Sequence, residues 1–210
     1  MKPTSPSSEH PRTALFLDLC GSTAGQEPGA GLAGDSVTRG DAYGDARRRF
    51  FLRARQVIRR FGGDSQAGSA DDFCSGFSNP QDAVIAALSL QADLTTKPIL
   101  HAGQPMACRL GLHTEPIAND EAGYLSQAGN LSSRLPAAVP PGGVAATGAV
   151  RELARGLAGV RFESLGEQSF KGIKWPIEVF QVTSPGSVLT AIVRPVLARV
   201  RRLVRQRSLP

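Results

Sequence analysis

Apolar residues follow two different periods along this chain, and together they predict its secondary structure. Four consecutive apolar residues at 14–17 predict a buried strand over 13–19. Apolar positions at helical spacing predict a helix over 42–61, which Gly62 and Gly63 end. The same reasoning predicts the remaining elements: a β-hairpin over 64–77, strands over 106–114, 144–147, 161–171 and 177–182, and helices over 80–94, 124–135 and 149–157.

The order of these elements indicates the fold class. We expect an α+β fold, a ferredoxin-like or palm-type sandwich in which helices cover a mixed sheet. The polar, proline-bearing residues 1–12 are expected to be disordered, residues 13–184 to form one domain, and residues 185–210 to form a basic amphipathic helix. A glycine-rich surface loop is expected over 24–41.

Composition indicates the class of protein and the compartment that we expect. A hydrophobic content of 41% and a charged content of 20% are typical of a globular chain. The three cysteines are widely spaced and form no CxxC pair, which argues against a disulfide framework or a zinc site. The sequence has neither a signal-peptide pattern nor an apolar run of transmembrane length, so we expect a cytoplasmic protein.

The net charge of +6 comes from the C-terminal segment 186–210, which has six arginines and no acidic residue. The rest of the chain has 18 basic and 18 acidic residues, so we expect no nucleic-acid partner. Within 188–206, apolar residues occupy one helical face and arginines most of the other. This pattern is typical of a helix docked on its own sheet, or of one in peripheral contact with an anionic membrane or a partner.

Candidate chemistry begins where the first strand ends. Residues 16–23 read FLDLCGST, and Asp18 places a carboxylate at the end of a buried strand. Uncompensated buried charge is costly, and carboxylates and carbonyls are the ligands that Mg²⁺ and Mn²⁺ prefer. The turn Gly21-Ser22-Thr23 offers N–H groups and hydroxyls to a phosphate. Taken alone, the octet is equally typical of a strand that ends in an Asp-capped turn.

A second carboxylate strengthens the metal hypothesis. Asp71 is placed at the tip of the 64–77 hairpin, where it can meet Asp18. Two such carboxylates can hold two divalent ions, which suits in-line displacement at phosphorus. The neighbouring Asp72 is expected to be a solvated turn residue.

Three further residues offer contacts to a nucleotide. Asn130 and Arg134 are four positions apart in the 124–135 helix and project from one face of it. Arg134 supplies a permanently charged donor for phosphate, and Asn130 an uncharged donor for a ribose oxygen. Lys171 is either a phosphate ligand or a solvated hairpin lysine.

Five ordered segments resemble motifs of the class III nucleotide cyclase catalytic domain. FLDLCGST resembles that family's metal-binding strand and loop, and GGDSQAGSADDF resembles its GG…GDGF hairpin. RLGLHTE resembles the central RxGxHTG strand, and NLSSRL resembles the NxAxRL helix. LGEQSFKGIKWPIEVFQV resembles the closing hairpin, so the likeness runs over most of residues 13–184.

The resemblance implies a site and a reaction. Asp18 and Asp71 would bind two Mg²⁺ or Mn²⁺, with the Leu19 backbone carbonyl as a further ligand. Asn130 would orient the ribose, and Arg134 would stabilise the pentacovalent transition state of 3′-hydroxyl attack on the α-phosphate, which releases pyrophosphate. The substrate-binding residues expected around this chemistry are Phe16, Leu19, Cys20, Gly21, Ser22, Thr23 and Lys171.

The resemblance also implies an assembly. Active sites of the family form at a head-to-tail dimer interface, with the aspartates on one protomer and the Asn/Arg pair on the other. A homodimer with two sites is therefore expected.

Two base-reading positions depart from the family pattern, besides Ala70 and Asp72, which stand where the family usually has glycines. Ala67 stands where adenylate cyclases have a base-reading lysine, and Gly123 where an aspartate is frequent. Because the metal and transition-state positions remain, we expect a changed base rather than a decayed enzyme. A purine (ATP or GTP) cyclase and a catalytically silent nucleotide-binding or dimerisation module are the alternatives.

The chain also resembles the stand-alone pyrimidine cyclases of bacterial anti-phage systems, which make cyclic UMP or cyclic CMP. In those enzymes an aromatic residue of the first helix crowds the pocket against purines. Tyr43 or Phe50 is the candidate here, although either ring is also typical of a core. We favour a uridylate cyclase that acts on UTP and serves antiviral defence.

Overall fold

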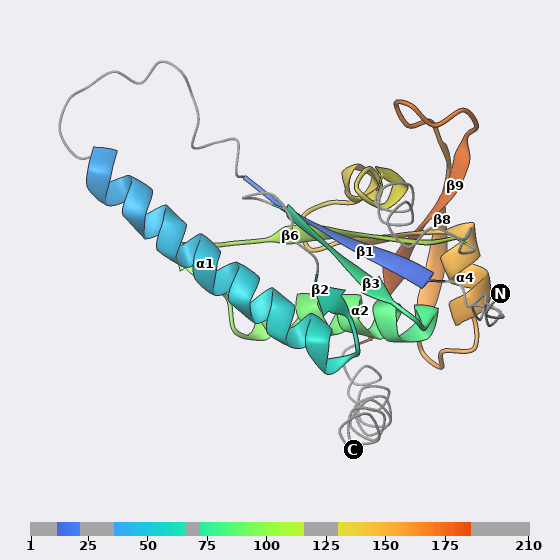
Figure 1. Cartoon of the computed structure of the whole chain (residues 1–210), viewed down its shortest axis with the longest axis horizontal. Coiled ribbons are helices and arrows are strands. Elements are labelled where there is room, and N and C mark those ends of the chain that lie inside the picture. The colour runs from blue at the N-terminus through green and yellow to red at the C-terminus, as the bar shows by residue number, and fades with distance from the viewer. Residues whose placement is uncertain (1–11, 22–35, 66–71, 116–129, 186–210) are drawn as a thin grey trace, which may run out of the picture.

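The computed structural model describes residues 12–21, 36–65, 72–115 and 130–185. These residues form a seven-stranded mixed sheet with the order β2-β3-β1-β6-β7-β9-β8 (Figure 1). The strands are β1 (Arg12–Leu19), β2 (Asp64–Ser65), β3 (Asp72–Phe77), β6 (Cys108–Glu115), β7 (Val144–Thr147), β8 (Arg161–Gln168) and β9 (Ile177–Thr183). The β6–β7 pair is parallel, and the other neighbouring strands are antiparallel.

Helices cover the sheet on both faces. They are α1 (Ser36–Arg60), α2 (Pro80–Thr96), α4 (Gly148–Ala154) and the 3₁₀ helix η2 (Leu135–Ala138), and a separate hairpin joins β4 (Leu100–His101) to β5 (Gln104–Pro105). At the start of α2 the Asn79 side chain accepts a hydrogen bond from the Gln81 amide at 2.9 Å, which caps the helix ahead of Pro80. Within the described ranges no helix is both long and apolar enough to cross a membrane.

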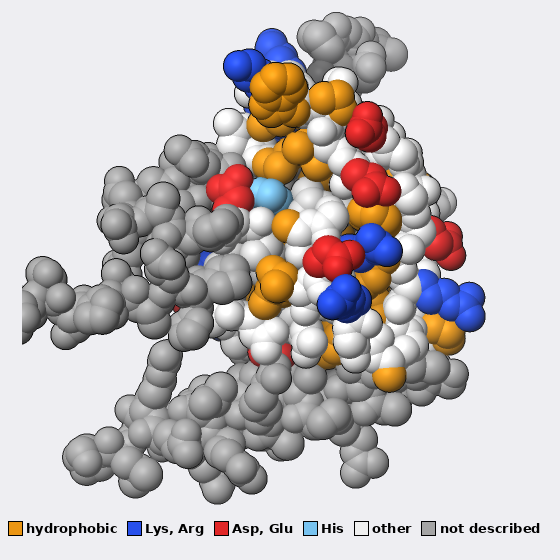
Figure 2. All heavy atoms as spheres, turned by 90° about the vertical axis from the view of Figure 1, so that its right-hand side faces the viewer, with side chains coloured by type: hydrophobic (Ala, Val, Ile, Leu, Met, Phe, Trp, Pro, Cys, Tyr) orange, Lys and Arg blue, Asp and Glu red, His pale blue; other side chains and the backbone are white. Residues whose placement is uncertain are grey.

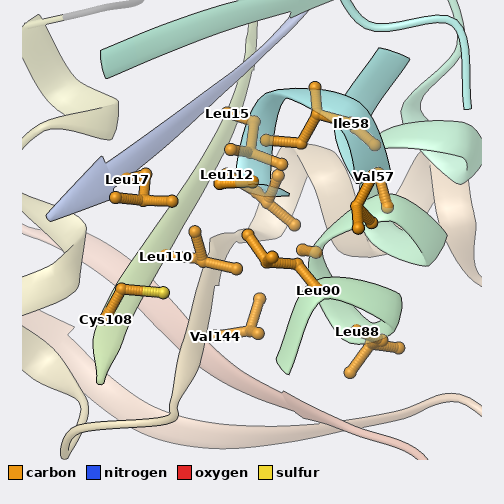
Figure 3. Close-up of a cluster of buried hydrophobic side chains, with 14 of the residues drawn as sticks. Leu15, Leu17, Val57, Ile58, Leu88, Leu90, Cys108, Leu110, Leu112 and Val144 are labelled. Carbon is orange, nitrogen blue, oxygen red and sulfur yellow. The ribbon is translucent and has the colours of Figure 1, made fainter. Parts of the chain in front are cut away.

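The main core lies between the sheet and the pair α1 and α2. Alternation along β1 points Leu15, Leu17 and Leu19 to this side, where they pack with Leu110 and Leu112 of β6 (Figure 3). The helices contribute further buried side chains, among them Phe50, Ile58, Ile85 and Leu90. The other face of β1 therefore carries Phe16 and Asp18, both half-buried.

The segment 131–139 packs closely against that second face. A Cβ atom at Gly111 of β6 would overlap the carbonyl oxygen of Ser132 and lie 2.8 Å from Pro136 Cδ and 2.9 Å from Leu135 Cβ. Only glycine lets the backbone of this segment approach β6 so closely. The approach places Arg134 over the end of the sheet where Asp18 lies.

Most predicted elements are confirmed, and the α+β fold class is confirmed. The structure differs at ends of elements: Arg12 belongs to β1, α1 begins at Ser36 inside the expected glycine-rich loop, and β8 ends at Gln168. The helix expected over 124–135 is helical at 130–132 and then gives way to η2, because Pro136 lacks an N–H and disfavours helical backbone before it. The β4–β5 hairpin was not predicted. The segments 1–11, 22–35, 66–71, 116–129 and 186–210 lie outside the described residues, and with them most of the expected glycine-rich loop, the hairpin tip and the first half of the 124–135 helix.

The Gly111 contact predicts the effect of one added methyl group. Gly111→Ala should lower the free energy of unfolding by about 2 kcal/mol or more, since the segment 132–136 must move off the sheet. Gly148→Ala is the matched control, because its Cβ would meet only Phe180 at 3.8 Å in a helix, and should be neutral or stabilising. Urea unfolding measures both; equal stability of the two variants would contradict the close packing.

Candidate active site

An ion pair between Asp18 and Arg109 marks the edge of the second face. The Arg109 guanidinium donates from Nη2 at 2.5 Å and from Nε at 3.1 Å, and both bonds go to Asp18 Oδ2. The two residues are register partners on β1 and β6, and each side chain is 32% exposed. Arg109 thus compensates the carboxylate that the sequence placed at the end of the first strand.

A second carboxylate flanks this pair. Asp72 is the register partner of Asp18 on β3, so Asp72, Asp18 and Arg109 form one row across three strands and one face. Asp72 is half-buried in β3, which corrects the expectation of a solvated turn residue. Like charges directly opposite on a sheet repel, so this row favours a cation beside Asp18.

A pocket of about 330 Å³ opens beside the ion pair. It is lined by Asp18, Arg109, Ser133, Arg134, Pro136, Ala137, Ser169, Phe170 and Lys171. Three of these side chains are cationic and one is anionic, which makes the pocket suitable for an anion such as a polyphosphate. The structure therefore brings Asp18, Arg134 and Lys171, predicted from three distant segments, to one pocket.

Arg134 is held by its neighbour one helical turn earlier. Its Nη2 and Nε atoms donate to Asn130 Oδ1 at 3.1 and 3.3 Å. The loop between β8 and β9 comes close on the other side, since a Cβ at Gly172 would lie 3.8 Å from Arg134 Nη2. Asn130 is exposed and does not line the pocket.

The other residues predicted from the first strand, its turn and the later motifs lie at different places. Phe16 lies on the same face as Asp18, whereas the Leu19 side chain is buried in the main core. The Cys20 amide donates to the Ala107 carbonyl at 2.9 Å, and Gly21 has a φ of 82° that favours glycine. The predicted residues outside the described ranges are Ser22, Thr23, Ala67, Asp71 and Gly123.

The two aromatic candidates of the first helix lie away from this pocket. Tyr43 makes an edge-to-face contact with His101 of β4, with ring centroids 5.1 Å apart. Phe50 is fully buried in the main core and contacts Phe51. Neither ring lines the pocket beside Asp18.

The donors beside Asp18 fit a divalent cation. Both Arg109 contacts go to Oδ2, and no described residue donates to Oδ1. Carboxylate oxygen is the donor that Mg²⁺ and Mn²⁺ prefer, and Asp72 supplies a second one opposite. Within the described segments no three His, Cys, Asp or Glu side chains converge, so a complete metal site would need donors beyond them.

Sequence reasoning missed Arg109 as a site residue. The signal was present in RLGLHTE, because the apolar Leu110 and Leu112 face the core and alternation sends Arg109 to the opposite side. Its pairing with Asp18 could not be predicted, because it depends on the register of β1 against β6. Ser133 lies in NLSSRL, and Ser169 and Phe170 lie in the closing-hairpin motif, but their place in the pocket depends on the fold and could not be predicted from the motifs alone.

The thiols near the site are not activated. Burial raises the pKa of Cys20, although the nearby Arg109 guanidinium opposes that rise. Burial also raises the pKa of Cys74 to about 11 and raises that of Cys108. All three are therefore protonated at neutral pH, and a thiolate nucleophile does not fit this pocket.

No protein-family model matches the sequence, and no curated protein is similar enough to match it. Solved structures with a similar fold are nucleotide cyclases. The guanylate cyclase domain from Catenaria anguillulae, solved in complex with GTP, has a TM-score of 0.64 at 16% identity, covering 85% of this chain and 99% of that one. The adenylyl cyclase CyaB from P. aeruginosa has a TM-score of 0.63 at 18% identity over 83% and 94% of the two chains.

A third structure, an adenylate/guanylate cyclase/hydrolase from Silicibacter pomeroyi, has a TM-score of 0.61 at 23% identity. It covers 86% of this chain and 99% of that one. The described chain therefore has the fold of a class III cyclase domain, as its motifs predicted.

Proposed function

We propose that this protein is a metal-dependent nucleotide cyclase that converts a nucleoside triphosphate to its 3′,5′-cyclic monophosphate and pyrophosphate. The proposed substrate is UTP. The observation that carries the proposal is that, within a cyclase fold, one edge of the sheet gathers the carboxylate Asp18 and the cations Arg134 and Lys171, where a second copy of the chain can share them. A carboxylate for cations and separate guanidinium and ammonium groups for phosphates are the parts that this reaction needs.

The reaction is a displacement at the α-phosphorus. The ribose 3′-oxygen forms a bond to that phosphorus, and the bond from phosphorus to the bridging oxygen of the β-phosphate breaks. Pyrophosphate leaves with the electron pair, and the hydroxyl proton passes to solvent. Arg134 would neutralise the charge that builds up on the α-phosphate oxygens, and Lys171 would hold the departing phosphates.

The cation site would consist of Asp18, the Leu19 carbonyl and Asp71. When bound there, divalent ions would favour the ionised 3′-oxygen and offset the charge on the leaving group. Arg109 holds the same carboxylate oxygen in the free chain, so a cation at Oδ2 would have to displace its guanidinium. The freed guanidinium would then be available to a phosphate in the same pocket.

A second copy of the chain would complete the site. The pocket of one chain does not include Asn130, which is exposed and accepts a hydrogen bond from Arg134, so the pair is accessible to a second chain. In the homodimer implied by the motifs, Asn130 and Arg134 of one protomer would serve the Asp18 of its partner. Each site would then depend on both protomers.

The proposed base specificity rests on positions 67 and 123, which depart from the family pattern. Ala67 and Gly123 cannot read a purine by side-chain hydrogen bonds, so a pyrimidine, UTP before CTP, is the proposed substrate. Cyclic UMP would then be a second messenger in defence against phage. Two similar structures were solved in complex with ATPαS and with GTP, so the purine alternative belongs in the test.

Product analysis tests the proposal directly. The purified chain is incubated with Mn²⁺ and each of the four nucleoside triphosphates, and products are identified by mass spectrometry. We expect cyclic UMP as the main product. Dominant cyclic AMP or GMP would contradict the pyrimidine assignment, and no cyclic product from any triphosphate would leave the silent module as the better description.

Arg134→Ala tests the transition-state role. It should lower kcat by about 10²-fold with little change in melting temperature, because the guanidinium contributes charge rather than packing. Arg155→Ala is the matched control, since Arg155 is exposed directly after α4 and pairs only with Glu152 among the described residues. Equal activity of the two variants would refute the assignment.

Arg109→Gln tests the competition at Asp18. Removing the tethered guanidinium should tighten nucleotide-free Mn²⁺ binding by about twofold to fivefold, the range of a partly exposed ion pair. Free Mn²⁺ is measured by electron paramagnetic resonance. Arg53→Gln is the control, because Arg53 forms a similarly exposed pair with Asp93 at 3.4 Å; weaker binding in Arg109→Gln alone would contradict the competition.

A further inference from the structure

Helix α1 concentrates the positive charge of the described chain. Its 25 residues include eight arginines and two aspartates. Figure 1 shows it as a long helix whose first turns extend beyond the strands. The net charge of residues 1–185 does not reveal this cluster of arginines, because acidic residues elsewhere in the chain balance it.

One side of α1 packs on the core and the other faces solvent. Phe50, Ala54 and Ile58 are buried. At helical spacing, the opposite side presents a stripe that we call the basic face of α1. Its exposed members are Arg48, Arg49, Leu52, Gln56, Arg59 and Arg60.

Three arginines of this face form no ion pair with any described residue. Arg53 and Arg55, at the edges of the face, are used internally: Arg53 pairs with Asp93, and Arg55 lies over the rings of Phe51 and Phe73. Arg49, Arg59 and Arg60 have no acidic partner among the described residues. Their charge is therefore available to an external anion.

An exposed leucine lies in the middle of this charge. The Leu52 side chain is 58% exposed, between the arginines at 48 and 49 and those at 59 and 60. The face from 48 to 60 is about 18 Å long, enough for several lipid headgroups. An apolar side chain flanked by arginines is typical of a helix that lies in a membrane interface.

We propose that the basic face of α1 binds the surface of an anionic lipid bilayer. The arginines would contact lipid phosphates, and Leu52 would enter the boundary between headgroups and acyl chains. A nucleic acid offers phosphates too, but it would leave Leu52 against a polar backbone, and the phenylalanine rings of α1 that could stack on bases are buried. Lipid is therefore the occupant that accounts for both the unpaired arginines and the exposed Leu52.

Vesicle co-sedimentation of the full chain tests the charge component. The triple variant Arg49→Gln/Arg59→Gln/Arg60→Gln should bind phosphatidylserine-containing vesicles about 100-fold less tightly than the unchanged chain. The control, Arg151→Gln/Arg155→Gln/Arg161→Gln, removes the same charge on the side of α4 and β8. Acidic and basic side chains lie next to each other on that side (Figure 2). All variants keep the arginines of 186–210, so any binding by that segment is common to them.

Each outcome of this comparison decides the matter. Loss of vesicle binding in the α1 variant alone supports the proposal. Equal loss in both variants means that net charge, not this face, is responsible, and unchanged binding excludes the face. Arginine-dependent binding of a single-stranded oligonucleotide without vesicle binding would overturn lipid in favour of nucleic acid.

The single tryptophan of the chain permits a second test of the apolar component. In a Trp175→Phe background, the fluorescence of the tryptophan introduced by Leu52→Trp should be quenched by lipids with brominated acyl chains. Leu153→Trp is the matched control, since Leu153 is 46% exposed on α4. Quenching confined to position 52 supports insertion, and equal or absent quenching at both positions contradicts it.

Discussion

The close approach of the segment 131–139 to β6 is the constraint on which the site depends. Gly111 leaves no Cβ between the strand and this segment, so the backbone at Ser132 can lie directly on the sheet. Arg134 follows within two residues and reaches the pocket beside Asp18. A larger residue at 111 would shift Arg134 away from this edge of the sheet before any catalytic residue changed.

Charge balance around Asp18 follows from that geometry. Three adjacent strands place Asp72, Asp18 and Arg109 in one row, and the pocket adds Arg134 and Lys171. The pocket itself, whose lining has one carboxylate and three cations, is unsuited to a neutral ligand and suited to a metal-bound polyphosphate. A cation bound at Asp18 would compete with the Arg109 guanidinium for the charge of that carboxylate, which couples cation binding to a phosphate-binding group.

The sequence predicted the fold well where apolar periodicity was strong, as in β1, α2 and β7. It failed where local chemistry decided the end of an element, as at Pro136, and where a long helix overrode glycine-rich composition, as at the start of α1. Asp18, Arg134 and Lys171 could be chosen from motifs, but Arg109 and Asp72 became site residues only through strand register. Likewise, the basic face of α1 was hidden in a balanced charge count until burial separated its arginines.

Mixing two inactive variants tests the central claim most directly, namely that Asp18 and Arg134 act in one site built from two chains. Asp18→Asn and Arg134→Ala are each expected to be inactive alone. Random re-pairing gives mixed dimers with one intact site, so the mixture should recover about a quarter of the unmutated activity. A mixture as inactive as its components, with dimers shown to exchange, would contradict the shared site and assign Asp18 and Arg134 to a pocket within one chain.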